Sequence, residues 1–212
     1  MSILAVTTTA TVTRLATLAV LKVELGITTG DLDESLALQL DQASDAIQNY
    51  LNRILATETV TETFRGWTDL PGGEELMLGR YPIQSVASVT VDGVMLDPSY
   101  YLIDQGKGAL YRIDADDALT PWDAASKISV VYTAGYALPG EASRTLPAAI
   151  ERACLDVAKA GYFSTQRDPA LKEMEVPGVL RESYWVGATG SEVAGIPGSV
   201  ASGLEPFRRI VI

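Results

Sequence analysis

The residues of this chain that could do chemistry are almost all carboxylates, because the sequence has no histidine and a single cysteine, Cys154. Histidine is the usual general base and metal ligand, and common zinc sites are built from histidine and cysteine. The composition therefore excludes Ser-His and Cys-His nucleophiles and zinc sites of the common type. The pairs Glu74 with Glu75 and Glu173 with Glu175 are side chains that a glycosidase could use, but nothing in the sequence places either pair across a cleft.

Two further segments contain the residue types of ligand-binding loops without their spacing. DADDALTPWDAA, residues 114–125, begins like a calcium loop, yet Leu119 stands where that loop needs glycine and Ala125 where it needs a bidentate glutamate. DQGKGALY lacks the spacing and the strand-then-helix context of a phosphate loop, so Gly106 and Gly108 are interpreted as hairpin residues. We predict no enzyme activity, no cofactor and no metal site.

The charge of the chain is acidic and unevenly distributed. The formal net charge is −11, and residues 1–164 carry 21 acidic and 11 basic side chains, whereas residues 165–212 carry 6 and 5. Specific DNA binding is not expected, because it requires clustered Lys and Arg to neutralise phosphates. The 47% of hydrophobic residues and a mean hydropathy of +0.15 indicate apolar surface buried against other subunits.

Neither a signal peptide nor a membrane span is predicted, because Arg14 and Lys22 interrupt the apolar residues of the first segment before a membrane-length run develops. A cell-surface β-rich adhesion module is one alternative, and the absence of a signal peptide counts against it. Cys154 lies within a helical apolar pattern and is interpreted as a small buried hydrophobic residue.

Three segments have the periodicity of helices. TLAVLKVELG has Thr17 at the N-cap position and Gly26 as a left-handed stop. A longer helix follows an acidic link, and a third, LPAAIERACLDVAKAGYFS, has Pro147 in its first turn. The apolar stripes of the second and third helices consist of Leu36, Leu40, Ala43, Ile47 and Leu51, and of Leu146, Ile150, Cys154, Val157, Ala158 and Phe163.

Between the second and third helices the period changes from 3.6 to 2. The segments TVTETFRG, EELMLG, SVASVTVDG, SYYLID, ALYRID and KISVVYTAGY each predict a short strand, and turn residues separate them. Asp92-Gly93 is the dipeptide of a type I′ hairpin turn, which needs positive φ at both positions.

The last part of the chain, residues 165–212, differs from the rest. It contains six Gly and four Pro, so long regular elements are not expected, yet it also carries apolar and aromatic side chains. Such a segment docks either onto a partner or onto its own body, and both alternatives remain open.

From these elements together we predict an α+β fold. It comprises an N-terminal arm at residues 1–16, a body at 17–164 and an extended irregular C-terminal arm at 165–212. The body is a helical body of two N-terminal helices and one C-terminal helix, with a small antiparallel β-sheet inserted at about residues 57–136.

The order of these elements resembles a known family. A short helix TLAVLKVELGI, a long helix ALQLDQASDAIQNYLNR, then TETFRG, LGRYPIQSVASVTVDGVMLDPSYYLID, VVYTAGY and LPAAIERACLDVAKAGYF resemble the head-to-tail connector, or adaptor, family of tailed bacteriophages and gene transfer agents. The resemblance covers about residues 15–164 and an ending of the kind LEPFRR. None of these motifs is catalytic, so the resemblance lies in the whole series.

The resemblance implies a structural virion protein that is made in the host cytoplasm and located in the neck between capsid and tail. Members of that family form a ring, usually a dodecamer, below the portal protein; the ring extends the DNA channel and docks a stopper or tail-completion protein. Double-stranded DNA would pass without specific binding, and an acidic body would repel its phosphates. The alternatives are a stopper, or head-completion protein, that closes the channel, and a carboxylate-based hydrolase.

The resemblance also suggests that the C-terminal arm binds the portal. Phe207 would be an apolar anchor, and Arg208 and Arg209 would meet carboxylates of the partner. The terminal RRIVI could add an edge strand to a partner sheet. The residues predicted to bind a partner are Trp185, Leu204, Pro206, Phe207, Arg208, Arg209, Ile210, Val211 and Ile212.

Overall fold

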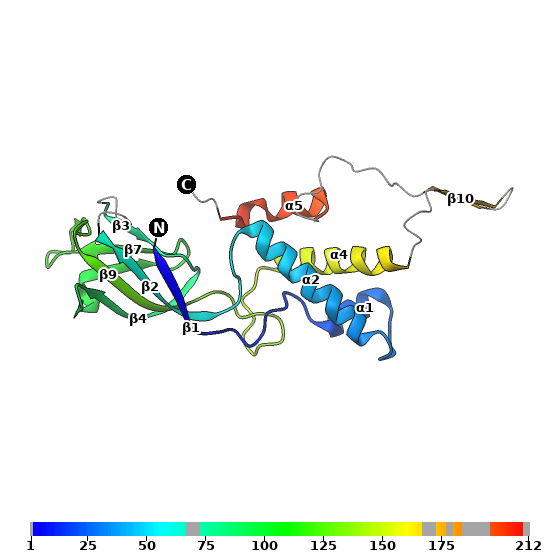
Figure 1. The fold of residues 1–212 in the computed structure, drawn as a ribbon, viewed down its shortest axis with the longest axis horizontal. Helices are drawn as coiled ribbons and strands as arrows, with labels where there is room; N and C mark the ends of the chain where they lie inside the picture. The colour runs from blue at the N-terminus through cyan, green and yellow to red at the C-terminus, as the bar shows by residue number, and fades with distance from the viewer. Residues whose placement is uncertain (1, 67–72, 167–172, 177–179, 184–195, 210–212) are drawn as a thin grey trace. The chain divides into compact units, whose positions relative to one another are not determined.

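The computed structural model describes residues 2–66, 73–166, 173–176, 180–183 and 196–209, which divide into two compact units (Figure 1). Unit 1 contains residues 1–12 and 54–137, and unit 2 contains residues 13–53 and 138–212. Unit 1 is built of strands and unit 2 mainly of helices, so the predicted α+β class is confirmed. The chain crosses between the units three times.

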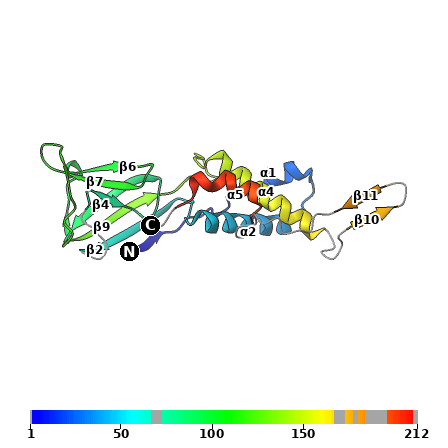
Figure 2. The same ribbon diagram turned by 90° about the horizontal axis from the view of Figure 1, so that it is seen from above.

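The helices of unit 2 begin and end where the sequence indicates. Helix α1 spans Leu18–Leu25, with the Thr17 hydroxyl accepting from Val20 N and Gly26 at φ 68°, as predicted. Helix α2 spans Asp33–Leu51 and α4 spans Ala148–Thr165. A shorter helix, α5, spans Gly198–Leu204 and continues into the 3₁₀ turn η2, Glu205–Phe207. Figure 2 shows α5 beside α4, on which it packs.

Helices α2 and α4 pack through their apolar stripes, except that Phe163, predicted to belong to the stripe of α4, is 54% exposed. All five predicted apolar positions of α2 are buried, and Cys154 of α4 is fully buried, as predicted. The Ser44 hydroxyl lies 3.5 Å from the Cys154 thiol, and a side chain added at Gly161 would meet Gln39. Residues late in α4 therefore contact residues early in α2, which makes the two helices antiparallel. Glu24 links α1 to α4 through ion pairs with Arg152 and Lys159.

The strands of unit 1 form two antiparallel sheets, where the sequence predicted one small sheet. All six predicted strands are present, and strand β1 and the two-residue strands β5 and β8 are added. One sheet has the order β1-β2-β9-β4-β5, made of Ile3–Thr8, Glu58–Arg65, Lys127–Ala134, Ile83–Val91 and Val94–Met95. The other has the order β3-β7-β6, made of Glu75–Met77, Ala109–Ile113 and Tyr101–Asp104, with β8 (Leu119–Thr120) paired to β7 and the 3₁₀ turn η1 (Pro98–Tyr100) before β6.

The core of unit 1 follows from the alternation of its strands. In β2 and β9 every second residue is buried. The core cluster comprises Val60, Phe64, Leu76, Leu78, Ile83, Val89, Tyr101, Leu110, Trp122, Ile128, Val130, Tyr132 and Ala134. The predicted type I′ turn joins β4 to β5, with φ 50° at Asp92 and 83° at Gly93.

Within residues 165–212 the described regular elements are short. Strands β10, Glu173–Val176, and β11, Leu180–Ser183, pair antiparallel. The 7-residue helix α5 follows in residues 198–204. The absence of long regular elements, which the Gly and Pro content predicted, agrees with the elements in this part of the chain that the structure describes.

A pair of glycine substitutions tests the closest backbone approach in unit 1. Gly135 has φ 117°, and a Cβ there would lie 2.2 Å from Ala56 O, so we expect Gly135→Ala to destabilise the protein by about 3 kcal/mol or more. Gly93 also has positive φ but open space around it, so Gly93→Ala should cost only about 1 kcal/mol. Urea unfolding measures the free energy of unfolding of both variants. An equal loss in the two would show that backbone strain at positive φ, and not the close approach of Ala56, causes the destabilisation.

Candidate partner-binding segment at the C-terminus

The C-terminal segment, defined here as residues 196–209, packs on unit 2. Ile196 and Leu204 have no exposed surface, and Ala201 is buried between them. Helix α5 is only seven residues long and has no side-chain N-cap, so this packing, and not intrinsic helix stability, must hold it.

Tyr50 of α2 binds the C-terminal segment at three points. Its hydroxyl lies 3.0 Å from Ala201 O and 2.6 Å from Glu205 Oε2, so it can donate to either acceptor. The Arg208 guanidinium lies 5.3 Å from the centroid of the Tyr50 ring, which is within cation–π range. The hydrogen bond to the Glu205 carboxylate raises the pKa of the Tyr50 phenol.

The backbone of the segment also caps α2. Arg209 N donates to Leu51 O at 2.9 Å, which satisfies one of the carbonyls that the last turn of a helix leaves without a partner. The helix itself ends at Asn52, which has φ 53° and adopts the left-handed conformation. Residues 196–209 therefore dock onto the body of their own chain, one of the two alternatives that the sequence left open.

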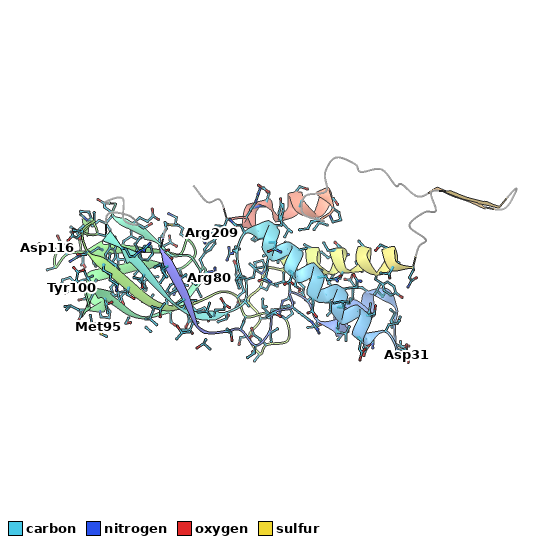
Figure 3. All side chains as sticks on the ribbon, viewed as in Figure 1. Asp31, Arg80, Met95, Tyr100, Asp116 and Arg209 are labelled. Carbon is cyan, nitrogen blue, oxygen red and sulfur yellow. The ribbon has the colours of Figure 1, made fainter. Side chains whose placement is uncertain are left out.

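The predicted partner-binding residues divide into three groups. Leu204 is fully buried and holds the segment to unit 2. Pro206 and Arg208 are exposed, and Phe207 and Arg209 are half-buried, so these four residues form the accessible end of the segment. Arg209 is labelled in Figure 3. Trp185, Ile210, Val211 and Ile212 lie outside the described residues. Partner binding by any of them stays a prediction.

Sequence reasoning missed Tyr50. A tyrosine three residues after Ile47 fits the apolar stripe of α2, so it was not distinguished from the other core residues. The feature that could have identified Tyr50 is its hydroxyl, because a tyrosine that is only 7% exposed normally has a hydrogen-bond partner for that group. The partner, Glu205, lies 155 residues further along the chain, and nothing in the local sequence points to it.

The described residues offer little for catalysis or metal binding. Over the described ranges there is no cluster of three or more His, Cys, Asp or Glu side chains that could hold a metal ion. In residues 114–125, the segment that begins like a calcium loop, Asp114 Oδ1 accepts from the backbone N–H of Asp116 and Ala118. It therefore stabilises its own turn. Glu75 accepts from the Tyr111 hydroxyl at 2.9 Å. The helices of the described part of the chain include none long and apolar enough to cross a membrane.

The model of the head completion protein family matches residues 14–167. A solved structure described as "Neck of empty GTA particle computed with C6 symmetry" contains a chain with 19% identity and a TM-score of 0.58, covering 99% of this chain and 97% of that one. Another, "Virion of native gene transfer agent (GTA) particle", gives 17% identity and a TM-score of 0.59. A third, "Neck of native GTA particle computed with C12 symmetry", gives 16% and 0.57. The second and third matches have the same coverage as the first.

A search of curated proteins found no significant match. At these identities the solved structures establish a shared fold and nothing further, whereas the family match covers well over half of the chain. The resemblance stated from the sequence is confirmed.

Substituting Tyr50 tests what holds the C-terminal segment. Tyr50→Phe keeps the ring and removes the hydroxyl, so we expect local opening of α5 to become easier by about 1–2 kcal/mol. Amide hydrogen exchange of residues 198–204 should then accelerate by about tenfold, with α4 unchanged. Tyr100→Phe, at an exposed tyrosine of unit 1, is the matched control. Unchanged exchange in α5 would mean that apolar packing alone docks the segment.

Proposed function

Because this chain belongs to the head completion protein family, we propose that it is a structural protein of the neck of a phage-like particle and acts as the adaptor between portal and tail. The observation that carries the proposal is the family match over residues 14–167. A role in assembly also agrees with side chains that serve packing and turns, such as Cys154 in the core and Asp114 in its own turn.

The proposed working form is a ring of identical copies. Two similar solved structures are particle necks computed with C6 and C12 symmetry. A ring needs two different surfaces on each subunit, one for each neighbour, and it closes when the rotation between neighbours fits. We infer a dodecamer that lies below the portal and carries the stopper or tail-completion protein on its other side.

The acidic surface suits a DNA channel. Asp31 and Glu34 near the start of α2 are exposed, as are Glu74 and Asp116 of unit 1. Asp31 and Asp116 are labelled in Figure 3. Like charge suppresses the phosphate contacts that give non-specific DNA affinity, so DNA would slide through such a lumen without being held. We propose that part of this acidic surface lines the channel.

The accessible end of the C-terminal segment is the proposed portal contact. Arg208 is exposed, and its ion pair with Glu205 is long, at 3.6 Å, with both side chains about half exposed. Such a pair contributes little and is easily exchanged for a carboxylate on a partner. Phe207 is half-buried next to it and can anchor an apolar contact.

A stopper that closes the channel is the second candidate, favoured by the description of the family as head completion proteins. The two roles differ in the binding partner. An adaptor binds the portal directly, whereas a stopper binds only after an adaptor ring is in place. Light scattering of the purified protein, alone and mixed with the portal protein of the same genome, separates them: one large joint assembly supports the adaptor, and independent species contradict it.

Charge reversal tests the portal contact. We expect the double variant Arg208→Glu, Arg209→Glu to lose about tenfold or more in portal affinity, because like charges would then face each other. Lys127→Glu, at the exposed first residue of β9, is the control and should bind normally. Binding is measured by co-sedimentation, with thermal unfolding to show that the fold is kept. Unchanged affinity in a folded double variant would remove the C-terminal segment from the contact.

Two pairs of charge reversals test the channel surface. We expect Asp31→Lys with Glu34→Lys, or Glu74→Lys with Asp116→Lys, to make assembled rings retain double-stranded DNA. Each new phosphate contact steepens the dependence of log affinity on log salt by about 0.9. Filter retention across a salt series measures this, with wild-type rings as control. If retention stays flat for both pairs, neither acidic region faces the DNA.

A further inference from the structure

Unit 1 contains a built docking site for the N-terminal strand. Glu62 of β2 is only 1% exposed, so its carboxylate needs hydrogen-bond donors from the protein. It accepts from Gly79 N and from the Tyr132 hydroxyl, each at 2.7 Å, and from the Ser2 hydroxyl. Two of these donors come from the body of unit 1 and the third comes from the residue before β1.

Gly79 shows that the site is shaped for this strand. A Cβ added at Gly79 would lie 3.0 Å from Leu4 Cδ1 and 3.1 Å from Glu62 Oε1. Leu4 is the side chain of β1 that packs on the core cluster of unit 1. Any larger residue at position 79 would therefore press on both the leucine and the carboxylate. The site recognises one hydroxyl and one leucine, spaced two residues apart on an extended strand.

The remainder of β1 adds backbone pairing and little burial. Its register with β2 runs from Ile3↔Thr63 to Val6↔Val60, with an irregularity before Thr8. Five of its six residues are exposed, among them Ile3 at 51% and Val6 at 41%. Residues 2–13 contain no charged side chain. An uncharged edge strand with exposed apolar residues lacks the protection that free edges usually carry, which fits a strand covered in an assembly.

The connection of β1 to the rest of the chain leaves open which copy supplies it. Residues 9–12 join β1 to unit 2, have no regular structure and are exposed or half-exposed. Strand β2 begins only after the segment 13–53 of unit 2. All contacts of Ser2 and Leu4 named above lie within unit 1, so an arm from another copy would make the same ones.

We propose that in the assembled ring residues 2–8 of one copy occupy this site on the neighbouring copy. The inference rests on the proposed ring. Each subunit has one arm and one site, so a closed ring fills every site and leaves no arm free. An empty site would leave the buried Glu62 carboxylate short of a donor and leave the edge of β2 without a partner strand. The site is therefore expected to be occupied both in the isolated chain and in the ring. In the isolated chain, the short connection favours binding of the chain's own arm. In the ring, exchange of arms links neighbouring copies through a shared β-sheet.

Paired cysteines test the exchange. Ala5 and Thr61 are directly opposite across the β1–β2 ladder, so cysteines there are within disulfide range. The native Cys154 does not compete, because burial raises the pKa of its thiol to about 11. We mix the single variants Ala5→Cys and Thr61→Cys, assemble them on the portal protein of the same genome and oxidise gently. A covalent dimer is then possible only between copies, and we expect about tenfold more in the assembly than in the unassembled mixture.

Two controls sharpen the result. Ala5→Cys mixed with Thr90→Cys, on β4, which β2 and β9 separate from β1, should give no dimer above background. The double variant Ala5→Cys, Thr61→Cys should form covalent multimers in the assembly and an internal bond in the free chain. Assemblies in which the double variant bonds only within each chain, and the mixed singles give no dimer, overturn the exchange but leave the proposed function standing. If wild type fails to assemble with the portal at all, the proposed function fails and the exchange falls with it.

Discussion

The antiparallel packing of α2 against α4 is the constraint on which the rest of the chain depends. At its centre is Ser44, which is 2% exposed; its hydroxyl accepts from Leu15 N at 3.0 Å, donates to Leu40 O at 2.7 Å and touches Cys154. A larger residue there would separate the helices, and an apolar one would leave Leu15 N without its acceptor. Because the helices are antiparallel, the end of α2 and the start of α4 lie at the same end of the pair. An entire β unit can therefore be inserted between residues 53 and 138 without disturbing the packing.

The same end of the helix pair receives the C-terminal segment. Tyr50 and Leu51, in the last turn of α2, provide the hydroxyl and the carbonyl that bind it. The last turn of a helix always has free carbonyls, and the chain uses one of its own later segments to satisfy one of them. The N-terminal strand follows the same logic in unit 1, where it closes the open edge of β2 and supplies a donor to a buried carboxylate. Strand β1 thus completes the sheet of unit 1, and residues 196–209 complete the end of α2 in unit 2.

Much of this architecture was readable in the sequence because it depends on local patterns. The stripe of α2, the caps at Thr17 and Gly26, and the Asp92-Gly93 turn follow from periodicity and backbone preference alone. What was missed depends on pairing between distant residues. Periodicity identifies strands but not their neighbours, so two sheets were read as one. The roles of Glu62 and Tyr50 were not predicted, because Ser2, which donates to Glu62, and Glu205, which binds Tyr50, lie 60 and 155 residues away in the chain. The partner-binding residues beyond Arg209 remain predictions for the same reason: their expected contact is with another molecule.

The surface of the molecule explains the high hydrophobic content that the composition indicated. In unit 1, Val94 and Met95 after the β4 turn are each about 70% exposed, and Met95 and Tyr100 both project from the edge of that unit in Figure 3. In unit 2, Val23 is 79% and Phe163 54% exposed. These exposed apolar side chains agree with the proposed assembly, in which neighbouring subunits would cover part of them.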